Sequence, residues 1–131
     1  MAEFDLTYYS GTDEYSDGDE SENYLLAMNK AGKTLDDIPT KECTWPVFYH
    51  MSPMRENICN WYPFRKDATV LEIGAGCGAI TGILCQKAAH VTSIELSHRR
   101  AMINYERNKK YSNLTPVSYT HLRAHETLAN L

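Results

Sequence analysis

Two acidic residues and a run of glycines have the types and spacing of a ligand-binding site. Glu72 lies two residues before Gly74, which begins the string Gly-Ala-Gly-Cys-Gly, and Glu95 lies 21 residues after Gly74. Glycines let the backbone turn sharply and approach a ligand closely, because they lack a Cβ atom. A carboxylate at the end of the following strand can accept hydrogen bonds from both hydroxyls of a ribose. The pattern therefore predicts a site for an adenosine-containing ligand.

The segments around this site predict alternating strands and helices. Residues 68–73 and 90–96 are short, apolar, β-branched runs of the kind found in buried parallel strands. Residues 79–87 have apolar side chains at helical spacing, and Ser97 can cap a further helix to about residue 109. A right-handed crossover makes the strands parallel, so that the glycines and both carboxylates meet at one sheet edge. The predicted fold class is α/β, a Rossmann-like three-layer domain in its first two βα units.

Glu72 distinguishes two classes of adenosine ligand. The glycine string also fits a dinucleotide site, but a pyrophosphate beside Glu72 would meet a like charge in a dry environment. S-adenosylmethionine has no phosphate and carries a positive sulfonium and ammonium. We therefore expect S-adenosylmethionine as the cofactor, with an NAD- or FAD-binding oxidoreductase as the alternative.

Two motifs carry a resemblance to a known family. Residues 70–78 resemble motif I of class I S-adenosylmethionine-dependent methyltransferases, and residues 91–97 resemble their second strand with its acidic residue. The resemblance implies that the glycines line the methionine end of the cofactor and that Glu95 holds the ribose. The predicted cofactor-binding residues are Glu72, Gly74, Ala75, Gly76, Gly78, Glu95 and Leu96.

The methyl acceptor stays open between a sugar, a small molecule, a protein and RNA. The whole chain is similar to bacterial methyltransferases found beside glycosyltransferases, which implies a role in polysaccharide biosynthesis. The portions around residues 71–76 and 79–84 also resemble ribosomal RNA adenine dimethyltransferases. Further family motifs would lie beyond Thr115, so we predict no catalytic residue. A further alternative is that the chain is an inactive binding fragment. We expect the chain as written to be poorly stable and to show no turnover.

The N-terminal part is expected to be less regular. Residues 1–20 are acidic and expected to be extended or disordered, and residues 21–51 form a helical and irregular extension. Gly32 ends its first helix, and Ser52 begins a helix over about residues 54–62 that opens the cofactor-binding domain of residues 52–115.

Several side chains have two interpretations each. Arg55 and Glu56 could reach the carboxylate and ammonium of the cofactor, or lie exposed on the surface. His98, Arg99 and Arg100 are expected to form a solvated first helical turn rather than steer a substrate. Three aromatic residues are expected to pack inside the protein rather than to stack on nucleic-acid bases: Trp61, Tyr62 and Phe64.

Residues 117–127 resemble one reading frame of a transposase-based sequencing adapter. We therefore expect residues 116–131 to be a non-native tail and the gene product to be cut near Thr115. His121 and His125, whose spacing would suit a metal on a helix, carry no weight for the same reason.

Composition limits the remaining function classes. The net charge is −4, so charge alone does not indicate nucleic-acid binding. The four cysteines lack C-x-x-C spacing, which favours reduced thiols over a zinc site, and Cys77 is expected to be a small filler. With no signal peptide or membrane span in the sequence, we expect a cytoplasmic protein without metal or membrane partners.

Overall fold

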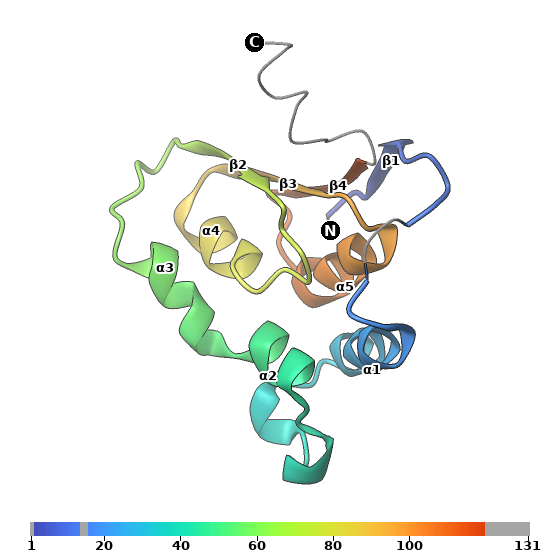
Figure 1. Cartoon of the computed structure of the whole chain (residues 1–131). Helices are drawn as coiled ribbons and strands as arrows, with labels where there is room; N and C mark the ends of the chain where they lie inside the picture. Colours follow the sequence, from blue (N-terminus) through green and yellow to red (C-terminus); the bar gives the residue numbers. More distant parts are fainter. Residues whose placement is uncertain (1, 14–15, 120–131) are drawn as a thin grey trace.

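The computed structural model describes residues 2–13 and 16–119 as a parallel sheet with helices on one face. The strands are β1 (Asp5–Tyr8), β2 (Thr69–Ile73), β3 (His90–Glu95) and β4 (Leu114–Tyr119). The α-helices are α1 (Asp19–Lys30), α2 (Trp45–Met51), α3 (Asn57–Asn60), α4 (Thr81–Lys87) and α5 (His98–Asn108). Short 3-10 helices are η1 (Leu35–Asp37), η2 (Thr40–Glu42) and η3 (Pro53–Glu56). Figure 1 shows the helices gathered below the sheet.

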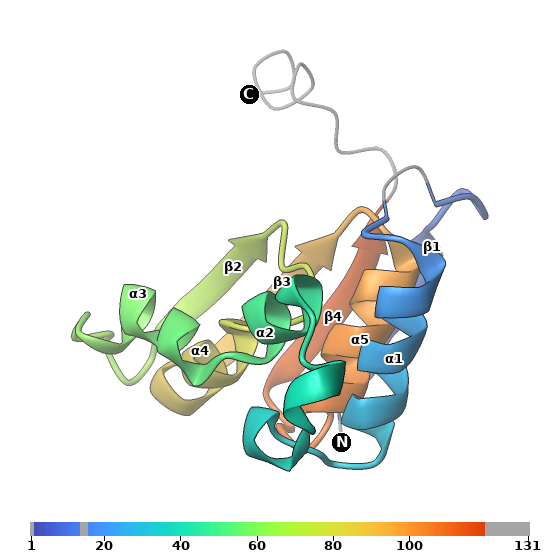
Figure 2. The same cartoon turned by 60° about the horizontal axis from the view of Figure 1, so that its bottom comes forward.

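The strand order β1-β4-β3-β2 is parallel throughout. The register pairs Ile73 of β2 with Ile94 of β3, and Ile94 with Val117 of β4. All strands therefore end at the same edge, where Figure 2 shows the arrowheads of β2, β3 and β4 side by side. This arrangement confirms the predicted α/β Rossmann-like class and the parallel pair β2 and β3.

The core has two parts, both on the helical side of the sheet. One lies between the sheet and α4, around Leu84, Val91 and Leu114. The other joins α1, α2 and α5 through Leu25, Val47 and Ile103 and is separate from the sheet core. The N-terminal extension is thus packed against α5 by its own hydrophobic contacts.

Two strands lie outside the predicted elements. The β1 strand lies in the acidic segment, and β4 includes residues 116–119 of the expected tail. Val117 and Tyr119 have side chains that suit a strand whatever their origin. Residues 120–131, with His121 and His125, lie outside the described residues, so the expectation for them is not tested.

Some helices of the structure match the helices predicted from the sequence, and others differ from them. The predicted helix before Gly32 is present as α1, the one at residues 79–87 as α4, and the one after Ser97 as α5. Ser52 and Ser97 act as predicted, since their side chains accept hydrogen bonds from the backbone N–H of Met54 and Arg100. The helix expected over residues 54–62 is divided into η3 and α3, and α2 occupies a region expected to be irregular.

Candidate functional site

The glycine turn after β2 is held against the end of β3. The backbone N–H groups of Gly74 and Ala75 both donate to the carbonyl of Ile94, at 2.9 and 3.0 Å. Gly74 and Gly76 have φ angles of 73° and 57°. These left-handed conformations favour glycine because a Cβ atom would crowd the backbone. The turn thus keeps the backbone of residues 74–76 open toward the sheet edge.

Glu95 binds this turn directly. Its Oε2 accepts a hydrogen bond from the backbone N–H of Gly76 at 2.7 Å, and its Oε1 accepts one from Ser97 at 3.0 Å. The side chain is buried at the end of β3. The structure therefore brings Glu95 to the glycine turn, and each oxygen retains a lone pair for a ligand hydroxyl.

Glu72 is a second carboxylate beside the turn. Its Oε2 accepts a hydrogen bond from the Thr81 hydroxyl at 2.6 Å. Burial raises the pKa of Glu72, the Thr81 hydrogen bond opposes this shift, and the nearby charge of Glu95 adds to it, so that the pKa of Glu72 is about 7. Two acidic side chains in one partly dry site repel anions and attract cations.

A cavity of about 140 Å³ lies between the glycine turn and the N-terminal extension. Glu72 and residues 74–77 form one wall, and side chains from α2, η3 and α5 form the others. Those side chains are Tyr49, His50, Arg55 and Arg100. Arg55 therefore lines the predicted site, whereas Glu56 lines a different cavity.

Gly78 packs against α5, and its predicted role in cofactor binding stays a prediction. A Cβ atom on Gly78 would lie 2.2 Å from Asn104 Oδ1 and 2.7 Å from Asn108 Nδ2. Its backbone carbonyl accepts a hydrogen bond from Asn108 at 3.1 Å. Gly78 is thus needed for the close packing of the turn against α5, and it does not line the cavity beside Glu72. Leu96 lines none of the cavities described here, so its role stays a prediction.

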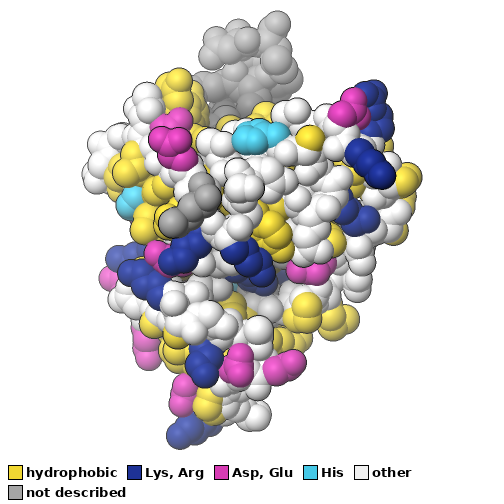
Figure 3. All heavy atoms as spheres, turned by 180° about the vertical axis from the view of Figure 1, so that it is seen from behind, with side chains coloured by type: hydrophobic (Ala, Val, Ile, Leu, Met, Phe, Trp, Pro, Cys, Tyr) yellow, Lys and Arg dark blue, Asp and Glu magenta, His cyan; other side chains and the backbone are white. Residues whose placement is uncertain are grey.

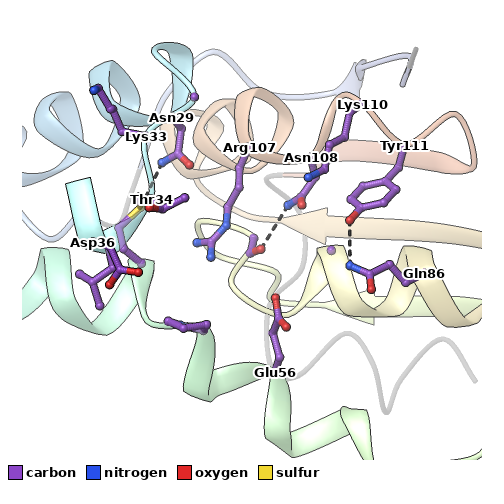
Figure 4. Close-up of a pocket in the computed structure, with 16 residues that line it drawn as sticks. Asn29, Lys33, Thr34, Asp36, Glu56, Gln86, Arg107, Asn108, Lys110 and Tyr111 are labelled. Atoms are coloured by element: carbon purple, nitrogen blue, oxygen red, sulfur yellow. Dashed lines mark hydrogen bonds between the residues drawn. The ribbon is translucent and has the colours of Figure 1, made fainter. Parts of the chain in front are cut away.

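The larger cavity shown in Figure 4 lies elsewhere in the helical layer. It has a volume of about 330 Å³ and is lined by polar side chains, including Glu56, Arg107 and Asn108. Arg107 extends into it from α5, next to Asn108 (Figure 4). It contains neither Glu72 nor Glu95, so its size does not make it the better candidate.

The acidic N-terminal segment is held by the basic residues at the start of α5. Arg100 pairs with Glu22 at 3.1 Å and with Asp17 at 2.5 Å, and Asp17 also contacts His50 at 2.8 Å. Arg99 pairs with Asp19 at 2.6 Å. The expectation of a solvated basic turn is therefore wrong, because this turn neutralises acidic groups 78 or more residues earlier in the chain.

Asp13 is a capping residue of α5 that the sequence did not reveal. Its Oδ1 accepts from the backbone N–H of His98 at 2.7 Å, and its Oδ2 accepts from Arg99 at 3.1 Å. These bonds satisfy free N–H groups at the start of α5, immediately after Glu95. The only signal in the sequence is that an early acidic segment and a later basic helix start have opposite charges. Opposite charge alone does not identify which residues pair.

Neither the cysteines nor the aromatic side chains add chemistry here. Burial raises the pKa of Cys77 to about 12, which makes this thiol a poor nucleophile and agrees with a filler role. Trp61 and Tyr62 are 75 % and 50 % exposed, so the expectation that both pack inside is wrong. Within residues 2–13 and 16–119, no cluster of side chains suits a metal ion.

Comparison with known proteins identifies the family of this site. The family model for ribosomal RNA adenine dimethylase matches residues 51–125, which include the glycine turn, Glu72 and Glu95. The chain belongs to the ribosomal RNA adenine dimethylase family. This membership confirms the predicted S-adenosylmethionine-dependent methyltransferase class and its cofactor.

Curated members of the ribosomal RNA adenine dimethylase family match parts of the chain. Ribosomal RNA small subunit methyltransferase A of Clostridium botulinum is 40% identical over 62 residues, covering 47% of this chain and 22% of that protein. The corresponding protein of Syntrophus aciditrophicus is 34% identical over 53 residues, covering 40% and 19%. An rRNA adenine N-6-methyltransferase of Bacillus licheniformis is 29% identical over 94 residues, covering 72% and 33%. The chain thus spans about a fifth to a third of the length of these relatives.

A solved structure supports the fold of this family member. Phosphoethanolamine N-methyltransferase 1 of Haemonchus contortus, solved with phosphoethanolamine and S-adenosylhomocysteine, superimposes with a TM-score of 0.50 at 22% identity. The match covers 80% of this chain and 22% of that protein. The comparisons favour the ribosomal RNA alternative over the expected role in polysaccharide biosynthesis, and a methyltransferase over an oxidoreductase.

Proposed function

We propose that this chain is the cofactor-binding part of an enzyme that methylates adenine in ribosomal RNA. The observation that carries the proposal is the family match over the segment that brings Glu72 and Glu95 to one glycine turn. When bound, S-adenosylmethionine would supply a methyl group from its positive sulfonium: an acceptor nucleophile would attack the methyl carbon in line with the carbon–sulfur bond, and S-adenosylhomocysteine would leave as the neutral thioether.

The residues of the site fit this cofactor by charge. Glu72 and Glu95 are partly and fully buried carboxylates, and the raised pKa of Glu72 reflects both burial and repulsion by Glu95. A pyrophosphate would add negative charge to this pair, whereas a sulfonium or ammonium would offset it. The charge of the site therefore supports S-adenosylmethionine over a dinucleotide.

Each group in the site would have a separate task. The open backbone of Gly74 and Gly76 would let the methionine end approach closely. Glu95, held by Gly76 and Ser97, would accept hydrogen bonds from the ribose hydroxyls. The chain's part in catalysis would then be binding and orientation, which bring donor and acceptor into line.

Ribosomal RNA is favoured as the acceptor by the family and its curated members. The net charge of −4 does not by itself indicate RNA binding, and on the face shown in Figure 3 Lys and Arg side chains are interspersed with Asp and Glu. A complete enzyme would therefore supply further contacts to RNA phosphates from outside the described residues.

Calorimetric titration of the 131-residue chain with S-adenosylhomocysteine and with NAD tests the cofactor. We expect binding of S-adenosylhomocysteine, and binding of NAD alone would overturn the proposal. For the acceptor, a complete enzyme containing this sequence would be given tritiated S-adenosylmethionine with ribosomal RNA or with a polysaccharide precursor. Label in the adenines of the RNA is expected, and label in the polysaccharide alone would refute the RNA assignment.

A further inference from the structure

Arg55 is a positive group without an anionic partner at the edge of the candidate site. No carboxylate among the described residues lies within 4.0 Å of its guanidinium. The guanidinium instead lies over the ring of Tyr49, 4.1 Å from its centroid. A cation–π contact orients the guanidinium but does not neutralise its charge, so the group can still bind an anion.

The other arginine of the cavity differs in this respect. Arg100 is already neutralised by Asp17 and Glu22, as described above. Of the two arginines that line this cavity, Arg55 is therefore the one that has no carboxylate within 4.0 Å among the described residues.

The cavity thus has groups of opposite charge on facing elements. Glu72 comes from β2 beside the glycine turn, and Arg55 comes from η3 in the N-terminal extension. An α-amino acid group carries an ammonium and a carboxylate on one carbon, and it matches such a pair of side chains. At about 140 Å³ the cavity is smaller than sites for whole drug-sized ligands, which begin near 300 Å³. It suits one end of the cofactor.

We propose that Arg55 binds the α-carboxylate of S-adenosylmethionine through its guanidinium, while Glu72 binds the α-ammonium. The inference rests on the proposed function, because it assigns one subsite of the same cofactor. A guanidinium is suited to the task since its parallel N–H groups match both oxygens of a carboxylate.

Two hydrogen bonds hold the segment that leads into Arg55. The backbone carbonyl of His50, at the end of α2, accepts a hydrogen bond from Arg107 of α5 at 2.5 Å. Ser52 then begins η3 by accepting from the N–H of Met54 at 3.4 Å. Arg55 is thereby presented to the glycine turn by a supported segment, and its guanidinium lies over the ring of Tyr49 from α2.

The test compares two ligands that differ only in the carboxylate. The chain would be titrated calorimetrically with S-adenosylhomocysteine and with decarboxylated S-adenosylhomocysteine, which retains the amine. We expect Arg55→Met to weaken binding of S-adenosylhomocysteine by about tenfold or more, the usual effect of losing a charged hydrogen bond. Binding of the decarboxylated ligand should change by less than about twofold, because it has no group for Arg55 to bind.

Matched variants separate a local effect from loss of fold. Arg65→Gln, at an exposed arginine paired with Asp67, should leave both affinities unchanged. Arg55→Lys should restore part of the preference for the carboxylate, since it keeps the charge but not the paired donors.

Each outcome is informative. An unchanged preference for the carboxylate in both Arg55 variants would overturn the inference and leave the proposed function intact. Failure of the unmodified chain to bind either ligand would instead count against the proposed function. If Arg55→Met lowers the melting temperature, Arg55→Lys decides the question, and equal losses for both ligands would reject a carboxylate contact.

Discussion

Glu95 accepts a hydrogen bond from the backbone N–H of Gly76 at 2.7 Å, although 19 residues separate them. The bond joins the end of β3 to the glycine turn after β2. The same carboxylate accepts from Ser97 at the start of α5. One side chain therefore orders the three segments that meet at the candidate site, and several consequences can be measured.

Replacing Glu95 should damage both binding and stability. Glu95→Gln places an amide N–H₂ group where two backbone donors need acceptors, so at least one buried bond is lost. We expect unfolding to become easier by about 1–3 kcal/mol and S-adenosylhomocysteine binding to weaken by more than about tenfold. Chemical denaturation and calorimetry would measure these effects. Glu20→Gln, at an exposed glutamate of α1, is the control, and equal results for both variants would disprove the role of Glu95.

Glu72 should make stability depend on pH in a predictable direction. Its pKa is about 7 in the folded chain, against an ordinary value of 4.5, mainly because of burial. A carboxyl with a raised pKa binds its proton more tightly when folded, so its contribution to stability declines as pH rises from about 4.5 to about 7. Glu72→Gln removes this decline, and it should stabilise the free chain on the order of 1–3 kcal/mol at pH 8.

Denaturation curves for the chain and Glu72→Gln at pH 5 and pH 8 would check the sign. We expect the advantage of Glu72→Gln to be larger at pH 8 than at pH 5. A variant advantage that is the same at both pH values would show that Glu72 titrates normally.

Gly78→Ala should be strongly destabilising because the space beside this residue is filled. Its φ of 74° is unfavourable for alanine, and the new Cβ would lie 2.2 Å from Asn104 Oδ1. We expect a loss of about 2–4 kcal/mol from overpacking and backbone strain together. Gly32→Ala is the matched control, since Gly32 has a φ of 67° but no atom within 4 Å. A loss as small as about 1 kcal/mol in both variants would show that only the backbone conformation matters.

Arg100→Met should weaken the attachment of the acidic N-terminal segment to α5, although Arg99 still contacts Asp19. The substitution leaves Glu22, whose side chain is 1% exposed, without its buried cation. Removing one partner of a buried pair costs about 3–5 kcal/mol, whereas an exposed pair contributes about 0–1 kcal/mol. Breaking the exposed Arg65–Asp67 pair with Arg65→Gln should therefore have little effect. Equal melting temperatures for the two variants would contradict a structural role for Arg100.

The face of the sheet opposite the helices should promote self-association. Leu71 and Ile73 are 57% and 61% exposed on β2, which pairs with β3 only among the described strands. Apolar side chains on an unpaired edge favour pairing with another chain. We expect sedimentation velocity to show concentration-dependent association that Leu71→Lys reduces. Ile58→Lys, at an exposed residue of α3, should not reduce it, and a monomeric unmodified chain would refute the prediction.

Local sequence patterns account for the elements that form the site. The apolar runs and the glycine string indicate β2, the turn and α4 in order, and Ser97 indicates the start of α5. These features depend on neighbouring residues, because side-chain periodicity, N-capping and positive φ angles are local properties. The convergence of Glu72 and Glu95 also follows, since parallel strands share one carboxyl edge.

The missed elements depend on contacts between distant residues. The β1 strand has few side-chain signals of its own and forms because its backbone pairs with β4. Arg100 and Glu22 are 78 residues apart, and neither sequence position identifies the other. The basic turn therefore resembled a solvated surface when read alone.

The sequence by itself determined the α/β class, the glycine turn and the two carboxylates at the sheet edge. Only the tertiary structure decided that Gly78 packs against α5, that the acidic segment binds Arg99 and Arg100, and that Arg55 shares a cavity with Glu72. The physical reason is that backbone preferences act between neighbours in the chain, whereas burial and charge pairing act between whichever groups folding brings together.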